Sequence, residues 1–128
     1  MGLDMMARTT PVLPKQQVDF DEPQSQTLWS WRKHPDLHGW MEALYFQKGG
    51  KGVDGMDGEA TFNCVPVVLT AEDLDSLELA VRTRSLPRTE GFFFGESRPE
   101  DQADDLQFIA AARTAIAAGL TVYYTSWW

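Results

Sequence analysis

The clearest pattern along the chain is the spacing of apolar residues between positions 35 and 46. Four of them recur at i, i+3, i+4 and i+7, as on an amphipathic helix: Leu37, Trp40, Met41 and Leu44. We expect this helix to begin near residue 33 and to end before the glycine pair at 49 and 50. Gly39 weakens such a helix by roughly 1 kcal/mol relative to Ala, and it leaves room for another segment to approach.

Two further helices are predicted from their start signals. Thr70 and Asp73 have the spacing of a capping box, and the helix that follows should end near residue 85. Ser97 and Glu100 repeat this spacing, so a third helix is expected from there to the region of residue 118, before Gly119. Its inward face is predicted to carry Leu106, Ile109, Ala110, Arg113 and Ile116.

Short β-branched and aromatic segments separate these helices. Strands are expected at residues 2–8, 61–69, 91–95 and 121–128, with Pro66 indicating a sheet edge or a bulge. The order β-α-β-α-β-α-β predicts an α+β or α/β fold, with one small sheet of about four strands and three helices. Helical crossovers favour parallel neighbours, although the short strands leave the pairing order open.

The 128 residues fit a single domain, spanning residues 1–128. Residues 9–26 are polar and contain three prolines, so we expect a surface arm. Residues 47–60 hold five of the ten glycines and are expected to form a flexible loop, for which a gating role stays open. This loop has neither the spacing of a phosphate-binding loop nor the acidic positions of a calcium loop.

Composition and charge narrow the classes of partner. The net charge of −8 at pH 7 disfavours double-stranded nucleic acid and anionic membrane surfaces as partners. One cysteine excludes an intrachain disulfide framework, and no apolar run reaches the roughly 20 residues of a membrane span. The sequence shows no signal peptide, so a cytoplasmic location is expected. We expect no cofactor, because the chain lacks the dinucleotide and P-loop motifs.

The densest group of chemically active residues lies between positions 29 and 45, with three of the five Trp, both His and an Arg-Lys pair. Cations at a helix start form an anion-binding corner, and aromatic rings provide flat faces for stacking. This combination is typical of a site for an anionic, nucleotide-like small molecule. The predicted ligand-binding residues are Trp31, Arg32, Lys33, His38, Tyr123, Tyr124 and Ser126. A simpler alternative is that Arg32 pairs with an acidic side chain and stacks on a Trp.

Several short motifs are spread along nearly the whole chain, which begins with Met-Gly-Leu-Asp-Met. They are Trp31-Arg-Lys, Leu37-His-Gly-Trp-Met, Phe62-Asn-Cys-Val-Pro-Val, Leu69-Thr-Ala-Glu-Asp-Leu, Gly91-Phe-Phe-Phe-Gly and Tyr123-Tyr-x-Ser-Trp. Together, and in this order, they resemble a widespread family of short proteins encoded by tailed bacteriophages and prophages. The resemblance implies a viral or prophage origin, hence the cytoplasm of a host cell, and carries no activity with it. His34 and the glycine-rich loop lie outside the motifs.

Two alternatives to small-molecule binding involve protein partners. The acidic balance, the proline-containing arm and the aromatic C-terminus suit an inhibitor that binds a host protein. Pairing of edge strands would instead give a homo-oligomer. The sequence does not decide between these interpretations.

Two further alternatives depend on the histidines. In a small enzyme, His38 would act as acid or base, and the partners available by type are Ser126, Cys64, Tyr124 and Asp36. A weak metal-site alternative uses the helical spacing of His34, His38 and Glu42. The simpler interpretations are solvated surface imidazoles and a small core cysteine.

Overall fold

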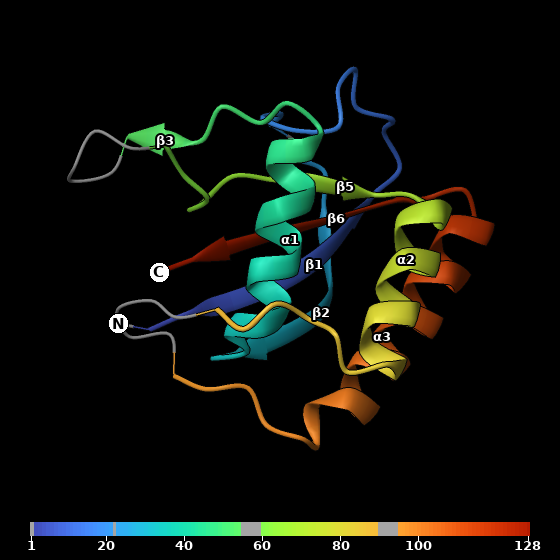
Figure 1. The fold of residues 1–128 in the computed structure, drawn as a ribbon. Coiled ribbons are helices and arrows are strands. Elements are labelled where there is room, and N and C mark those ends of the chain that lie inside the picture. The colour runs from blue at the N-terminus through green and yellow to red at the C-terminus, as the bar shows by residue number, and fades with distance from the viewer. Residues whose placement is uncertain (1, 22, 55–59, 90–94) are drawn as a thin grey trace.

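A computed structural model describes residues 2–21, 23–54, 60–89 and 95–128. Its centre is a four-stranded sheet with the strand order β2-β1-β6-β5 (Figure 1). The strands of this sheet are β1 (Asp4–Thr10), β2 (Gln26–Arg32), β5 (Val67–Leu69) and β6 (Thr121–Trp127). A separate small sheet pairs β3 (Val53–Asp54) with β4 (Ala60–Thr61).

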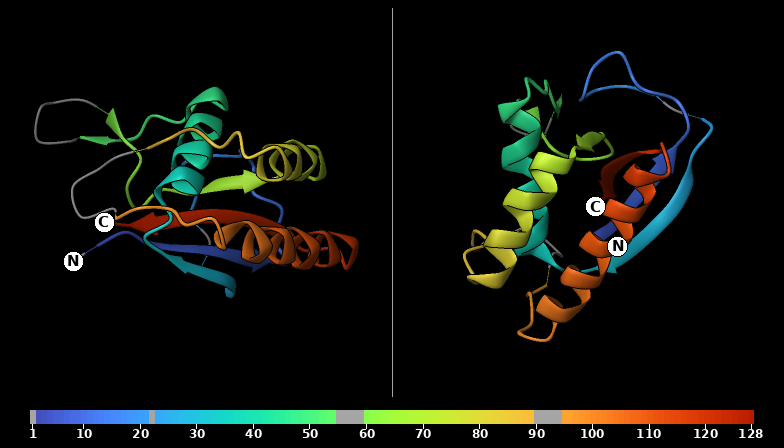
Figure 2. Two further views of the ribbon diagram at one scale, coloured as in Figure 1. Left: turned by 60° about the horizontal axis from the view of Figure 1, so that its bottom comes forward. Right: turned by 90° about the vertical axis from the view of Figure 1, so that its right-hand side faces the viewer.

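The three helices are α1 (Pro35–Gln47), α2 (Ala71–Arg82) and α3 (Asp101–Ala117). Helix α1 lies across one face of the sheet, and α2 and α3 pack side by side (Figure 1, Figure 2). The predicted α+β class, with one four-stranded sheet and three helices, is confirmed. Among the described residues, no helix is both long and apolar enough to cross a membrane.

All pairings in the central sheet are antiparallel. The preference for parallel neighbours is therefore wrong, and so is the α/β alternative. The chain does not return to the sheet through repeated strand-helix-strand crossovers. Instead β1 and β2 are joined by a loop, and β6, which follows α3, enters between β1 and β5.

Strand β2 is an element that the sequence analysis did not assign. Its Trp31 was predicted as a ligand-binding residue, but it belongs to a β-prone segment that pairs along most of β1. The proline-containing arm is correspondingly shorter than predicted, because residues 9 and 10 belong to β1 and residue 26 belongs to β2. The strand predicted at residues 91–95 falls almost entirely on positions 90–94, outside the described residues.

The helix starts differ in how well the sequence predicted them. In α2 the capping box is present, with Thr70 Oγ1 accepting from Asp73 N at 3.2 Å and Asp73 Oδ2 accepting from Thr70 N at 2.9 Å. The capping box predicted at Ser97 is wrong, because α3 begins only at Asp101 and has no side-chain cap. The buried face of α3 is also shifted, and consists of Asp105, Phe108, Ile109, Ala112 and Ala115.

Gly39 has the function expected of it, since it allows a second segment to cross α1. A Cβ atom at this position would lie 1.8 Å from Thr89 Oγ1. The Thr89 backbone N–H donates to Asp36 Oδ1 at 3.0 Å, which fixes the crossing. The segment before α3 is thereby held against the first turn of α1, where the candidate site lies.

Candidate functional site

A hydrogen-bonded row of three side chains joins the start of α1 to α3. His34 Nδ1 lies 2.6 Å from Ser97 Oγ, and His34 Nε2 lies 2.8 Å from Asp105 Oδ2. The imidazole and the carboxylate are 3% and 1% exposed, whereas Ser97 is partly exposed. The row therefore runs from the protein interior to the surface.

The Asp105 carboxylate determines the protons in this row. An ionised carboxylate only accepts, so His34 carries a proton on Nε2 and donates it to Asp105. In the neutral imidazole Nδ1 is then an acceptor and takes the hydrogen bond of the Ser97 hydroxyl, whose oxygen also accepts from Asp36 N at 3.0 Å. Trp31 Nε1 donates to the other Asp105 oxygen at 3.2 Å, so both oxygens of this buried carboxylate are satisfied.

Local structure brings these residues together. Lys33 has a left-handed backbone with φ of 57°, which turns the chain sharply between β2 and α1. His34 follows as the N-cap residue of α1, but its side chain makes no cap and points to α3 instead. Ser97 supplies the missing cap from another segment by accepting from Asp36 N. Asp105 occupies the buried face of α3.

Electrostatics at Asp105 reflect two opposing effects. Burial raises the pKa of the Asp105 carboxyl above its usual value, while the hydrogen bonds from His34 and Trp31 act to lower it. The deprotonated carboxylate accepts from both donors, and its hydrogen bond with His34 Nε2 orients the imidazole. Asp105 is thus suited to holding His34 in one orientation.

Two cavities meet at Ser97. The larger has a volume of about 530 Å³ and is lined by Pro35, Asp36, Arg88, Thr89, Gly95, Glu96 and Ser97. The smaller has a volume of about 110 Å³, and its lining includes His34, Asp101 and Asp105. Asp36 and Ser97 border both cavities. Ser97 therefore stands where the buried row reaches a space of ligand size.

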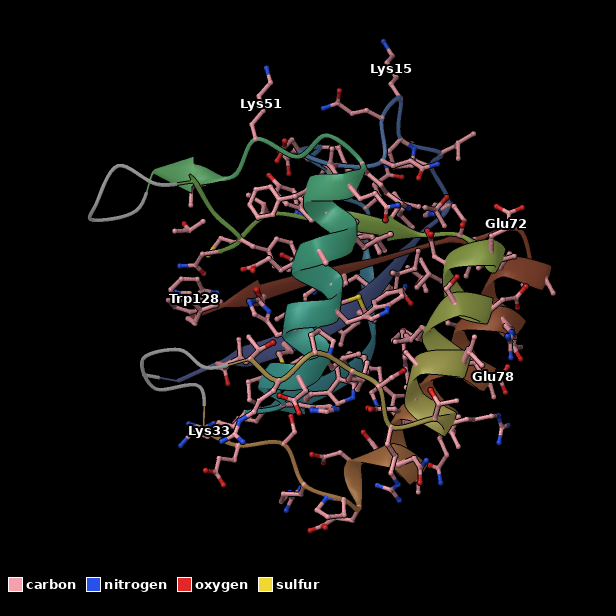
Figure 3. The ribbon with its side chains drawn as sticks, viewed as in Figure 1. Lys15, Lys33, Lys51, Glu72, Glu78 and Trp128 are labelled. Atoms are coloured by element: carbon pink, nitrogen blue, oxygen red, sulfur yellow. The ribbon has the colours of Figure 1, made fainter. Side chains whose placement is uncertain are left out.

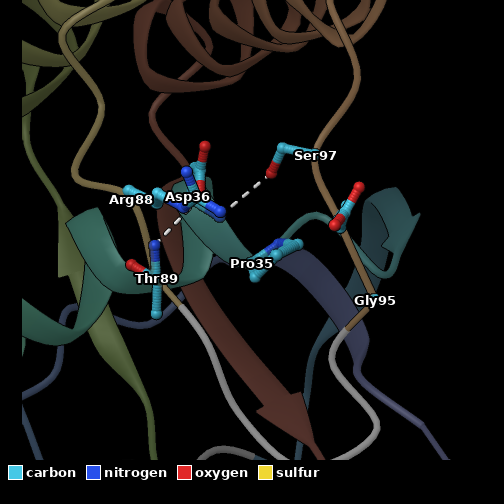
Figure 4. Close-up of a pocket in the computed structure, with 7 residues that line it drawn as sticks. Pro35, Asp36, Arg88, Thr89, Gly95 and Ser97 are labelled. Carbon is cyan, nitrogen blue, oxygen red and sulfur yellow. Dashed lines mark hydrogen bonds between the residues drawn. The ribbon is translucent and has the colours of Figure 1, made fainter.

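The wall of the larger cavity is fixed by hydrogen bonds to Asp36. Figure 4 shows Asp36 between Ser97 and Thr89, with a dashed line to each. Among the residues that the structure describes, its lining carries one cation, Arg88, and two carboxylates, Asp36 and Glu96. Gly95 must remain small, because it has φ of 74° and a Cβ atom there would lie 3.0 Å from the Lys33 Cβ. Lys33 is thus next to the cavity, at the amino end of α1 (Figure 3).

The predicted ligand residues His38, Tyr124 and Ser126 lie in the protein core. His38 is 0% exposed, and its Nδ1 lies 2.7 Å from the Tyr124 hydroxyl. Its ring stacks on Phe62 with 5.0 Å between centroids. Burial lowers the pKa of His38 to about 4 and raises that of Tyr124 well above its usual value of 10. This imidazole is therefore neutral near pH 7.

The remaining predicted ligand residues do not join them. Arg32 has a side chain that is 70% exposed and pairs with Asp4 at 3.6 Å, which is the ion pair of the simpler alternative considered for it. Trp31 is buried against Phe108 and Asp105, and Tyr123 is buried with its ring edge-on to Phe20. The Arg32 guanidinium and the His38 imidazole thus occupy separate environments, one on the surface and one in the core.

The structure brings together one pair named for the enzyme alternative, His38 and Tyr124, in the buried core, and it separates the two histidines of the metal alternative. His34 contacts α3 and His38 contacts β6, and no group of three or more His, Cys, Asp or Glu side chains within the described part of the chain is placed to hold a metal ion. Glu42 is half-buried, which raises its pKa. Cys64 is exposed, not a core residue.

Sequence reasoning missed Ser97, Asp105 and Arg88 as site residues. Ser97 was interpreted as a helix cap and Asp105 as one of nineteen acidic residues. A usable signal was present in α3, where Asp105 shares a helical face with Phe108, Ile109 and Ala112. A carboxylate in an apolar stripe requires a buried donor, and His34 and Trp31 provide it.

Comparisons with protein-family models, with curated proteins and with solved structures find no match for this chain.

Proposed function

We propose that the chain binds an anionic, nucleotide-like small molecule in the larger cavity beside the amino end of α1. The observation that carries this proposal is a cavity of about 530 Å³ lined by a guanidinium and two carboxylates. This volume lies in the range of small-molecule sites, about 300–1,000 Å³. The ligand class is the one predicted from the sequence, but the residues differ, since only Lys33 of the predicted set adjoins this cavity.

The mixed charge of the lining favours a particular kind of anion. Arg88 is suited to a phosphate or carboxylate group, which it can bind through two parallel hydrogen bonds. Asp36 and Glu96 would repel a ligand that carries only negative charge. They would instead accept hydrogen bonds from hydroxyl or amino groups, as a ribose and a nucleobase provide. Nucleotides should therefore bind better than inorganic phosphate.

The resemblance to phage proteins stays a prediction, and it bears on the source of the ligand. A phage protein with such a cavity would meet nucleotides of the host cell, including signalling nucleotides. The proposal of binding does not depend on this origin, because it rests on the cavity and its lining residues.

Isothermal titration calorimetry with mono-, di- and cyclic nucleotides, and with inorganic phosphate as a comparison, tests this proposal. At least one nucleotide should release heat and bind more tightly than phosphate. Arg88→Ala should weaken that binding by about 10- to 100-fold, the range for a lost charge-assisted hydrogen bond. Arg32→Ala is the matched control, since Arg32 lies outside the cavity and should leave the affinity unchanged.

Two results would overturn the proposal. One is the absence of heat with every nucleotide in the panel. The other is binding that is lost in Arg32→Ala and retained in Arg88→Ala. This result would mean that the ligand binds at Arg32, at the exposed end of β2.

A further inference from the structure

The row Ser97–His34–Asp105 has the arrangement of an activated serine. A hydroxyl donates to an imidazole, and the imidazole donates from its other nitrogen to a buried carboxylate. We propose that Ser97 is a nucleophile that accepts an acyl group from a small carboxylic ester bound in the larger cavity, with His34 as its general base. This activity goes beyond ligand binding and requires no anionic group on the ester.

The distances meet the requirement for proton transfer. General bases act at about 2.6–3.2 Å from the oxygen whose proton they take, and Ser97 Oγ lies 2.6 Å from His34 Nδ1. Here Ser97 contacts Nδ1 of the imidazole, and the Asp105 carboxylate contacts Nε2. Either ring nitrogen can accept the serine proton while the N–H of the other donates to an acceptor, so this assignment of the two nitrogens permits general-base chemistry.

Asp105 and Trp31 act as positioning residues. The carboxylate stabilises the imidazolium that forms when His34 takes the serine proton, and the indole N–H holds the carboxylate in place. Asp101 also faces this imidazole, with Oδ2 at 3.8 Å from Nδ1. Other charged groups around His34, from α1, the end of α2 and the segment before α3, are Asp36, Arg84 and Arg98.

The reaction balances without a further reactant except water. Ser97 Oγ bonds to the ester carbonyl carbon while its proton passes to His34 Nδ1. Collapse of the tetrahedral species breaks the bond to the alkoxy oxygen, and the leaving alcohol takes the proton from His34. Water then attacks the acyl-serine by the same route, releasing a carboxylic acid and restoring the Ser97 hydroxyl. Arg88, a cation among the described lining residues, would donate to the developing oxyanion through its guanidinium.

A purely structural function for Ser97 makes a different prediction. Its hydroxyl also caps α1 by accepting from Asp36 N, so a cap alone would explain the contact without any reactivity. A cap does not require a partner that removes the serine proton. Reactivity of Ser97 that depends on His34 therefore distinguishes the two functions.

The test is covalent labelling of the intact chain by an alkyl fluorophosphonate, followed by mass spectrometry of peptides. The label should be found on Ser97 and be absent in Ser97→Ala. His34→Gln should label at least about 100-fold more slowly, the lower range for loss of a general base. Ser30→Ala is the control, because Ser30 is an exposed serine on β2 and its removal should change nothing.

A second measurement covers the case in which His34→Gln does not fold, as judged by circular dichroism. In the unaltered chain, Ser97 should then label at least about 100-fold faster than the exposed Ser30, and this difference should disappear in urea. The proposal is overturned by absence of label on Ser97, by an equal rate in folded His34→Gln, or by equal labelling of Ser97 and Ser30 in the folded chain. Nucleotide titration of the unaltered chain is a separate measurement that needs no reactive serine, so failure of the two proposals can be told apart.

Discussion

His34 and His38 lie one helical turn apart, yet the structure gives them opposite environments. His34 connects a partly exposed serine to a buried carboxylate beside two cavities. His38 stacks on Phe62 in the core and contacts the Tyr124 hydroxyl. The sequence places both on one side of a helix, but α3 meets the first and β6 meets the second. Partners from distant segments thus decide which imidazole can do chemistry.

The difference also concerns the groups that surround each imidazole. His34 has two carboxylates near it, Asp105 at 2.8 Å and Asp101 at 3.8 Å. His38 is surrounded mainly by rings, and burial lowers its pKa to about 4. A general base needs a proton donor within hydrogen-bond reach that a substrate can also approach, and His34 has one in the partly exposed Ser97.

The largest expected effect comes from removing the carboxylate that holds His34. Asp105→Ala leaves the donors of His34 and Trp31 without an acceptor in the interior, and should lower the free energy of unfolding by about 4 kcal/mol. Urea denaturation measures this change. The matched control is Asp104→Ala, which removes the part-buried bond from Trp29 Nε1 and should cost only about 1 kcal/mol. Equal costs for the two variants would mean that Asp105 does not hold a buried network.

The second largest expected effect is a loss of stability at acidic pH, caused by the titration of His38. Because its pKa is lowered from 6.5 to about 4 in the folded chain, only the unfolded chain binds a proton between these values. Stability should therefore fall as pH decreases from 6.5 to about 4, and the loss should approach about 3 kcal/mol. Asp105 and Glu42 have raised pKa values, so each contributes with the opposite sign, because the folded chain binds the proton more tightly than the unfolded chain as pH falls.

Urea denaturation at a series of pH values measures the acid effect, with His38→Gln as the variant that sharpens it. The variant should be less stable at neutral pH, and it should lose the pH dependence between 6.5 and about 4 that His38 causes. If the slope in this window is the same in both chains, the titrating group is not His38, and the contrast between the two histidines fails.

Local signals in the sequence predicted the parts of the fold whose interactions lie within one turn. The stripe of α1 and the Thr70–Asp73 capping box are of this kind, since both partners are close in the chain. Strand pairing was not predictable in the same way, because β6 joins β1 across more than a hundred residues of sequence. The mistaken preference for parallel strands came from connection type alone.

The candidate site was predictable only in part. His34 was recognised as a residue of interest, but its partners Ser97 and Asp105 are more than sixty positions away. Arg32 was grouped with the aromatic residues because it adjoins Trp31, whereas alternation along β2 directs these neighbours to opposite faces. Recognising β2 as a strand would have separated the guanidinium from the core.

The smallest expected effect tests the hydrogen bond between His38 and the Tyr124 hydroxyl. Tyr124→Phe removes a hydroxyl 2.7 Å from His38 Nδ1 while keeping the ring that packs near Phe62 and Trp31. The loss of one buried hydrogen bond should lower the free energy of unfolding by about 1.5 kcal/mol in urea denaturation. Tyr123→Phe, on the opposite face of β6, is the matched control and should change it less. Labelling of Ser97 should be unaffected in Tyr124→Phe, because the His38 contact is separate from the His34 row. A reduced labelling rate at unchanged stability would show that the two histidines are coupled and that the division between core and site is not sharp.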